Sequence, residues 1–302
     1  MTSSASPDPD YPPAAETIDN AIPPARKHHP PSNMTVRVIS GAVLAVVTLA
    51  AAYVGEAPWL LLVTLLTTVG LLEFYALAHN RQSQGSAVVG LPAGIGVLLG
   101  AYGGELTLIA GSVAIALATA VVLETYRHPN DYRRTAWQVF TTMAGLAYIA
   151  FPLAGLLALR ALPDGFAWLL TVFAVTWGTD TCAYFGGRMW GKRKLAPRLS
   201  PKKTVEGAIA GVVGGFGFGV LFLALGGLVS AGAVLLVAIC PFVGIAGDLL
   251  ESALKRFFEV KDSHVRGLNI IPGHGGVLDR VDALILVTAV FYVVVQLGGL
   301  AG

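Results

Sequence analysis

Charge is what this sequence has least of. Asp, Glu, Lys and Arg together make up 13% of the 302 residues, whereas soluble domains carry about 25%. Hydrophobic residues supply 55% of the chain, and the mean hydropathy is +0.69. A soluble domain of this length has no core large enough for so much apolar surface. The composition therefore predicts an integral membrane protein.

Cysteine and strand-like alternation are also scarce. The two cysteines, Cys182 and Cys240, both lie in apolar stretches and show no metal-type pairing, so we interpret them as small buried hydrophobes. The apolar runs are too long for strands and do not alternate with polar residues. No strands are expected, and the predicted fold class is an all-α, polytopic membrane protein.

The first 33 residues differ from the rest of the chain. They are rich in Pro, Ser, Ala and Asp and have no apolar period, which predicts a disordered cytoplasmic tail. A secretory signal is excluded because no short apolar core precedes a small-residue cleavage site. Arg26, Lys27, His28 and His29 end this tail. They act either as a solvated topology signal or as contacts to anionic headgroups.

Nine stretches are long and apolar enough to be membrane spans, each needing about 20 residues. The predicted spans are 35–54, 57–79, 86–102, 105–125, 136–159, 166–187, 207–228, 230–250 and 282–301.

The basic residues predict the orientation of these spans. With a cytoplasmic N-terminus, every Lys and Arg except Arg160 falls on the inner side, as the positive-inside rule requires. Two inner loops are long, 188–206 and 251–281. We therefore divide the chain into the tail, N-terminal transmembrane helices at 34–165, and a transmembrane region at 166–302 that carries both loops, where the functional residues are expected.

The first polar group lies at the end of the sixth predicted span. Trp177, Asp180, Thr181, Tyr184 and Arg188 share one helical face by their spacing. A carboxylate in a membrane helix is costly and marks a functional site by default. A structural Asp–Arg pair that fixes helix packing is the alternative.

The second group is "SPKKTVEG" at 200–207. Ser200 is expected to be the N-cap of the next helix and Pro201 its first residue. Free N–H groups at that helix start, together with Lys202 and Lys203, predict a phosphate site. Glu206 either closes this site or binds metal, and an orientation signal with a helix cap is the simpler alternative.

The third group is on the eighth predicted span. Asp248, Glu251, Ser252 and Lys255 fall on one helical face, with Arg256 beside it. Asp248 is at the inner end of this span, where a hard cation can be held.

The fourth group opens the last span. Asp279 and Asp282 are three residues apart and point the same way. The helix dipole favours carboxylates at this position by about 0.3–1 kcal/mol each, which accounts for one of them. Carboxylates from two helix ends suit Mg²⁺ better than Zn²⁺. The nearby Lys and Arg are consistent with that ion if phosphates bridge between metal and cations.

These motifs resemble one known family. "ESALKRFFEVKD" followed by "IPGHGGVLDRVD" is similar to the signature of phosphatidate cytidylyltransferases, and "DTCAYFGGRMWGKRKLAPRLSPKKTVEG" is similar to a second block of that family. The resemblance covers about 177–282, and the first five spans carry no matching motif. At 263–271 the chain is several residues longer than the family pattern. The matching positions are Ser252, Lys255, Arg256, Lys261, Asp262, Pro272 to Gly276, Asp279, Arg280 and Asp282.

The resemblance implies that CTP and phosphatidate react to give CDP-diacylglycerol and pyrophosphate. It implies Mg²⁺ as cofactor, with a second cation left open. CTP, phosphatidate and membrane lipid are the expected partners. No nucleic acid is expected, and a homodimer is left open. The expected location is the plasma membrane, with the active site facing the cytoplasm.

The residues receive roles on this basis. We assign catalysis to Asp248, Lys255, Asp279 and Asp282. The hypothesis gives Mg²⁺ to Asp248 and Asp279, with Glu251 and Asp282 in support. The residues expected to bind substrate are Asp180, Tyr184, Arg188, Ser200, Lys202, Lys203, Thr204, Glu206, Ser252, Arg256, Lys261, Asp262, His274 and Arg280.

Other functions are weighed against this one. A CDP-alcohol phosphotransferase would carry a D-G-x2-A-R string, which this chain lacks. An ion transporter would place its polar groups near the middle of the membrane, whereas these gather at the inner ends of spans. Another membrane lipid phosphotransferase that uses CTP or CDP compounds, and a non-catalytic scaffold that kept the motif, also stay open.

Overall fold

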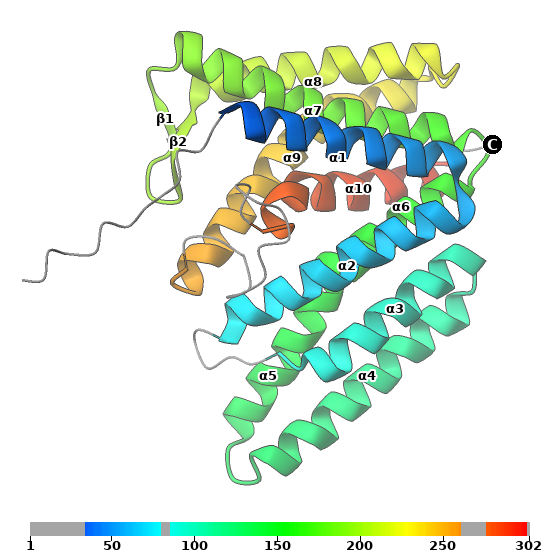
Figure 1. Cartoon of the computed structure of the whole chain (residues 1–302), viewed down its shortest axis with the longest axis vertical. Helices are drawn as coiled ribbons and strands as arrows, with labels where there is room; N and C mark the ends of the chain where they lie inside the picture. The colour runs from blue at the N-terminus through cyan, green and yellow to red at the C-terminus, as the bar shows by residue number, and fades with distance from the viewer. Residues whose placement is uncertain (1–33, 80–84, 261–275, 301–302) are drawn as a thin grey trace, which may run out of the picture.

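The structure is a computed structural model that describes residues 34–79, 85–260 and 276–300 (Figure 1). The tail at 1–33, the insertion at 263–271, and Lys261, Asp262 and His274 lie outside the described residues.

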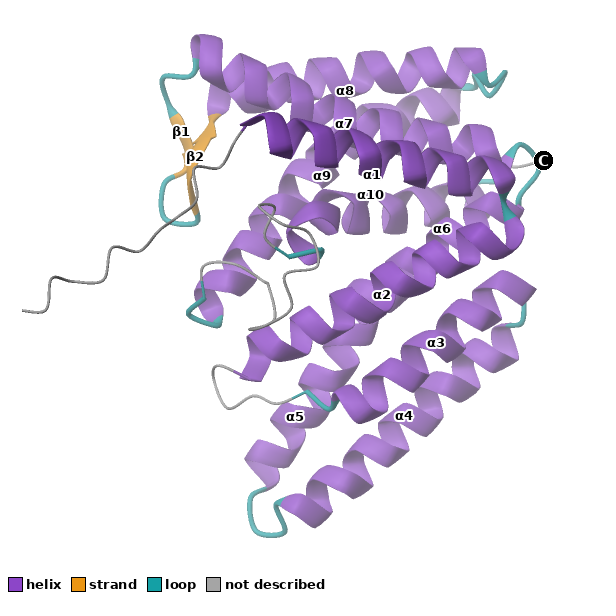
Figure 2. Cartoon of the chain, in the orientation of Figure 1, coloured by secondary structure: helices purple, strands orange, loops and turns teal. Residues whose placement is uncertain are grey.

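Helices make up most of the described chain (Figure 2). They are α1 (Met34–Val54), α2 (Glu56–His79), α3 (Ala87–Gly103), α4 (Leu106–Arg127), α5 (Tyr132–Gly145), the π-helical segment η1 (Leu146–Ala150), α6 (Phe151–Ala161), α7 (Gly165–Trp190), α8 (Val205–Leu225), α9 (Ala231–Phe257) and α10 (Leu278–Leu297).

Helices α5, η1 and α6 follow one another without a break. Pro152, in the first turn of α6, has no N–H to donate to the preceding turn, and the wider π turn falls just before it. Counted as one rod, this segment brings the described residues to nine helical rods, each overlapping one predicted span. The all-α, membrane-type fold is confirmed, while nine crossings stay a prediction.

Five of the helical rods in the described residues are long and apolar enough to cross a membrane, judged by length and composition. They are Glu56–His79, Leu106–Arg127, Tyr132–Ala161, Val205–Leu225 and Ala231–Phe257.

The expectation of no strands is wrong at one place. Strands β1 (Lys194–Ala196) and β2 (Ser200–Thr204) pair antiparallel, with Lys194 opposite Thr204 and Ala196 opposite Ser200. This hairpin lies between α7 and α8, outside the apolar runs on which the expectation was based. The predicted N-cap is wrong for the same reason, because Ser200 lies in β2. Thr204 caps α8, and its hydroxyl accepts from the Gly207 N–H at 3.1 Å.

One apolar core joins helices from both predicted transmembrane parts. Leu71 of α2, Leu156 of α6, Trp168 of α7 and Phe291 of α10 are all almost fully buried in the same cluster. The Trp59 indole N–H of α2 donates to the Leu156 carbonyl at 3.2 Å. The N-terminal helices therefore pack directly on the helices that carry the motifs.

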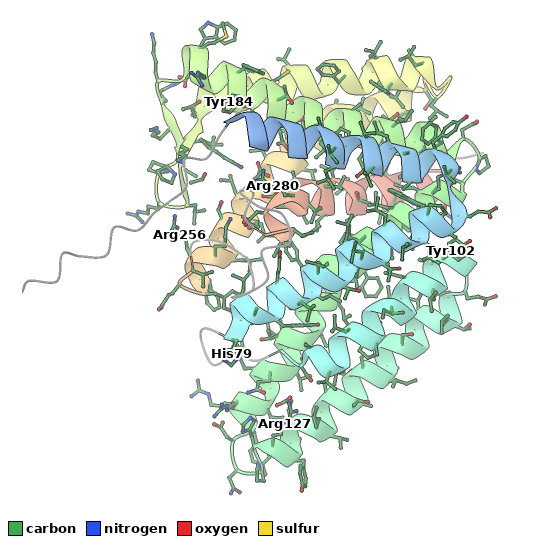
Figure 3. The ribbon with its side chains drawn as sticks, in the orientation of Figure 1. His79, Tyr102, Arg127, Tyr184, Arg256 and Arg280 are labelled. Carbon is green, nitrogen blue, oxygen red and sulfur yellow. The ribbon has the colours of Figure 1, made fainter. Side chains whose placement is uncertain are left out.

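The two ends of the bundle differ in charge. The β1–β2 hairpin, the end of α9 and the start of α10 lie at one end (Figure 1). Tyr184, Arg256 and Arg280 are labelled near that end and Tyr102 at the opposite one (Figure 3). Arg160, the exception to the charge bias, donates its Nε–H to the Ala52 carbonyl at 2.8 Å. It therefore supplies a hydrogen-bond donor to a carbonyl in the last turn of α1.

Candidate active site

A cavity of about 780 Å³ opens between α7, β2, the start of α8, α9 and the start of α10. It brings together residues from all four polar groups that the sequence singles out. The predicted site residues that line it are Asp180, Tyr184, Arg188, Lys202, Lys203, Thr204, Asp248, Glu251, Ser252, Lys255, Asp279, Arg280 and Asp282.

Helix α7 contributes the first wall. Asp180, Tyr184 and Arg188 line the cavity together with Ala183 and Gly187. The Arg188 guanidinium donates to the Tyr184 hydroxyl at 3.2 Å. Within the described residues no Asp180–Arg188 ion pair forms, so the structural alternative for this face is not supported.

The hairpin contributes the cationic wall. Lys202 and Lys203 of β2 line the cavity, with Thr204 at the point where β2 becomes α8. Glu206 lies outside it and holds the hairpin instead. Its carboxylate accepts from the backbone N–H groups of Lys192 at 3.0 Å and Arg193 at 3.1 Å.

Glu206 also pairs with the Arg193 side chain, Nε to Oε1, at 3.1 Å. These contacts fix the loop that carries the lysines, and Glu206 does not line the cavity; the role expected for it from the sequence stays a prediction. Ser200, in β2, does not line the cavity either, because the strand places it nearer the hairpin turn than Lys202 and Lys203.

Helix α9 contributes the acidic wall. Asp248, Glu251, Ser252 and Lys255 all line the cavity, so the predicted helical face is confirmed. The Lys203 ammonium pairs with the Asp248 carboxylate across 45 residues of sequence. Arg256, next along α9, is exposed and does not line the cavity.

Lys255 joins α9 to α10. Its ammonium lies 2.5 Å from Glu251 Oε2 and 3.0 Å from Asp279 Oδ1. Glu251 is only 2% exposed, and a buried carboxylate is stable only when it is paired or hydrogen-bonded. One lysine thus pairs with acids from two helices.

The start of α10 completes the cavity. Asp279 Oδ2 accepts from the Gly276 N–H at 3.0 Å. A carboxylate at a helix start is favoured by the helix dipole, and this accounts for Asp279. Asp282, one turn on, faces the same cavity. Gly247 allows the close approach of α9 and α10, because a Cβ there would lie 2.8 Å from the Asp282 carbonyl oxygen.

Two residues near the site were not found by sequence reasoning. Glu73 of α2 is 4% exposed, and its carboxylate accepts from the N–H groups of Val277 and Leu278. Tyr148 of η1 packs against Phe74, the neighbour of Glu73, with ring centroids 6.1 Å apart. An ionisable side chain in an apolar span was the available signal for Glu73. The sequence offered no such signal for Tyr148, because this residue lies in a π turn and π turns have no clear sequence pattern.

The predicted metal ligands share the cavity but do not form a ready-made cage. Within the described residues no three His, Cys, Asp or Glu side chains are grouped closely enough to hold a metal ion. Asp248, Glu251 and Asp279 instead contact lysine ammonium groups. The donors are all carboxylate oxygens, which suits a hard divalent cation.

The whole chain was compared with known families. A model described as the cytidylyltransferase family matches residues 35–298, which covers both transmembrane parts and all the cavity residues. The chain belongs to the cytidylyltransferase family. The family assignment made from the motifs, and with it the assignment as a nucleotidyltransferase, is confirmed.

Similar members of the cytidylyltransferase family are bacterial proteins named phosphatidate cytidylyltransferase. The chain is 38% identical over 268 residues to that of Brucella suis biovar 1, covering 86% of this chain and 93% of the relative. It is 33% identical over 277 residues to that of Bacillus subtilis, covering 88% and 98%. The Pseudomonas aeruginosa protein is 34% identical over 274 residues, covering 84% and 94%.

Proposed function

We propose that the chain transfers CMP from CTP to phosphatidate, giving CDP-diacylglycerol and pyrophosphate. The observation that carries the proposal is the cavity in which the two motif blocks meet, with Lys202 and Lys203 of the upstream block and Glu251, Lys255 and Asp279 of the signature in its lining. Family membership and the names of the relatives support the same reaction.

The reaction is a substitution at phosphorus. An oxygen of the phosphatidate phosphomonoester attacks the α-phosphorus of CTP and forms a new P–O bond. The bond from the α-phosphorus to the α,β-bridging oxygen breaks, and that oxygen leaves with pyrophosphate. A phosphomonoester has a second pKa of about 6, so the nucleophile is already ionised near neutral pH. The site needs to position groups and neutralise charge rather than supply a strong base.

The cavity residues divide into these tasks. Lys202 and Lys203 are assigned to the triphosphate, because β2 presents both ammonium groups to the cavity. Lys255 is assigned to the charge that develops on the leaving pyrophosphate. Arg188 and Arg280, which line the cavity on α7 and α10, are assigned to the phosphatidate headgroup.

Mg²⁺ is the proposed cofactor. Asp248 and Asp279 would hold it, supported by Glu251 and Asp282, since all four are hard oxygen donors lining the same cavity. When bound, the ion would withdraw charge from the phosphate oxygens. The chain's own part is to supply the carboxylates and to keep Lys203 and Lys255 beside them.

The membrane placement is part of the proposal. All nine helical rods of the described residues cross the plasma membrane, with the N-terminus and the hairpin end in the cytoplasm. CTP then reaches the cavity from water, and phosphatidate reaches it sideways between helices. The charge bias and the apolar helices support this arrangement.

The test uses the purified chain in detergent micelles with phosphatidate, CTP and Mg²⁺, and measures pyrophosphate. Release that requires both substrates and the metal is expected. ATP in place of CTP, and diacylglycerol in place of phosphatidate, serve as matched substrate controls. Pyrophosphate release independent of phosphatidate would reject lipid transfer.

A further inference from the structure

Helix α10 begins without a cap of its own. The residue at its N-cap position is Val277, which offers no side-chain hydrogen bond. The first N–H groups of a helix have no partner inside it and need one from elsewhere. Asp279 accepts from the Gly276 N–H, and the N–H groups of Val277 and Leu278 need acceptors from elsewhere.

Glu73 supplies both missing acceptors from a distant helix. Its Oε1 accepts from the Val277 N–H at 2.8 Å and its Oε2 from the Leu278 N–H at 2.7 Å. The two partners are more than 200 residues away in sequence. Glu73 is 4% exposed, so water contributes little at this contact. A carboxylate at a helix N-terminus is also favoured by the dipole.

The segment held in this way carries the proposed reaction's acids. Asp279 is the residue after Leu278, and Asp282 is one turn further along the same cavity-lining face. Asp279 in turn contacts Lys255. A shift of the first turn of α10 would therefore move both carboxylates and change the contact of Asp279 with Lys255 of α9.

The C-terminal half of α2, which carries Glu73, packs against neighbouring helices. Phe74, next to Glu73, packs edge-on against Phe258 at the end of α9, with ring centroids 6.4 Å apart. It also contacts Tyr148 of η1 at 6.1 Å. Glu73 therefore projects from a packed helix rather than from a loop.

We propose that Glu73 is a positioning residue, which fixes the start of α10 through its two N–H contacts and so sets Asp279 and Asp282 for nucleotidyl transfer. It does not touch substrate. The effect on turnover rests on the proposed function, whereas the capping of α10 does not.

The first test is hydrogen exchange measured by mass spectrometry on the wild-type chain in micelles. The amides of Val277 and Leu278 should exchange slowly, in a peptide covering 276–284. In Glu73→Gln the amide keeps one acceptor oxygen, and in Glu73→Ala both acceptors are lost. Protection should fall in the order wild type, Gln variant, Ala variant. Fast exchange in the wild type would overturn the proposal even if the variants fail to fold.

The second test is kcat per folded molecule. Removing an outer group that orients a metal ligand typically costs about 10–100-fold, so Glu73→Ala should lose about that much and Glu73→Gln less. Glu124→Gln is the control, since Glu124 of α4 is also fully buried, and it should leave exchange in the 276–284 peptide unchanged. Glu73 variants with wild-type kcat would overturn the positioning role. An inactive wild type with protected amides would refute the proposed function and leave the cap intact.

Discussion

Lysine ammonium groups occupy the acidic side of the cavity. Lys203 contacts Asp248, and Lys255 contacts both Glu251 and Asp279. Each charge is half-buried or buried, so removing one partner leaves the other without compensation. In the proposed reaction the same lysines would turn to the substrate phosphates, because phosphate offers the same kind of charge-assisted contact.

Lys203→Met should weaken the use of CTP. A hydrogen bond to a charged group contributes about 1.5–3 kcal/mol, so the KM for CTP should rise by at least about tenfold while the KM for phosphatidate stays near wild type. Lys194→Met is the control, because Lys194 lies on the paired strand β1 but does not line the cavity. An unchanged CTP dependence in Lys203→Met would remove Lys203 from the triphosphate site.

Removing both charges of this pair should cost less stability than the two single changes add up to. Lys203→Met leaves Asp248 unpaired, and Asp248→Asn leaves Lys203 unpaired, whereas the double variant leaves neither. The measurement is thermal unfolding of the three variants in one detergent. Strictly additive losses would show that the pair contributes no coupling.

Sequence reasoning reached these residues only in part. The spacing of Asp248, Glu251 and Lys255 predicted one helical face, because neighbours on a helix are three or four residues apart. The pairing of Lys203 with Asp248, and of Glu73 with α10, joins residues far apart in sequence. No local period encodes such contacts, since they depend on how whole helices pack.

At the scale of elements, close packing of α7 on α8 shapes one wall of the cavity. The buried residues of α8 include glycines at every fourth position, from Gly207 to Gly219. A Cβ at Gly211 would lie 2.9 Å from both the Ala183 Cβ and the Thr179 carbonyl oxygen. The helices approach this closely only because the side chain is absent.

Gly211→Ala should therefore destabilise the chain, since overpacking typically costs about 1–3 kcal/mol. Gly217→Ala, on the same helix, has nothing within 4 Å of the new Cβ and should be neutral or stabilising, because alanine favours helix over glycine by about 1 kcal/mol. The two melting temperatures in one detergent check this. Equal shifts in the same direction would contradict the packing account.

The hairpin is the second element that positions charge. Glu206→Gln should loosen the contacts to Lys192 and Arg193 and raise the KM for CTP a few-fold, through Lys202 and Lys203. The loss of stability should be small, because Arg193 is 74% exposed and exposed ion pairs are screened by water. Glu105→Gln, between α3 and α4, is the control. A large loss of stability without any change in KM would show that Glu206 has a different role.

Sequence patterns described the spans better than the connections. Apolar length located nine segments, each of which overlaps one helical rod of the described residues, although α9 runs on to Phe257 where the predicted span ends at 250. The "SPKKT" stretch fitted a helix start by composition, yet it forms β2, because pairing with β1 outweighs a local capping preference. The capping of α10 by Glu73 of α2 could likewise not be predicted from the residues around the start of α10.

At the scale of the whole molecule, the charges predict one orientation in the membrane. Cysteine labelling can test it in a variant whose Cys182 and Cys240 are replaced by alanine. An impermeant maleimide added to intact cells should label Glu105→Cys, and should label Arg198→Cys only after the cells are opened. The reverse pattern would contradict a cytoplasmic hairpin.

The account depends on one cavity doing the transfer of CMP. The most direct measurement gives the purified chain CTP labelled at the α-phosphorus and follows the label into chloroform-soluble lipid. The wild type should move the α-label into lipid, and γ-labelled CTP used in parallel should release its label as pyrophosphate. Asp248→Asn and Asp279→Asn, although folded, should do neither. Wild-type transfer by either folded variant would contradict the account.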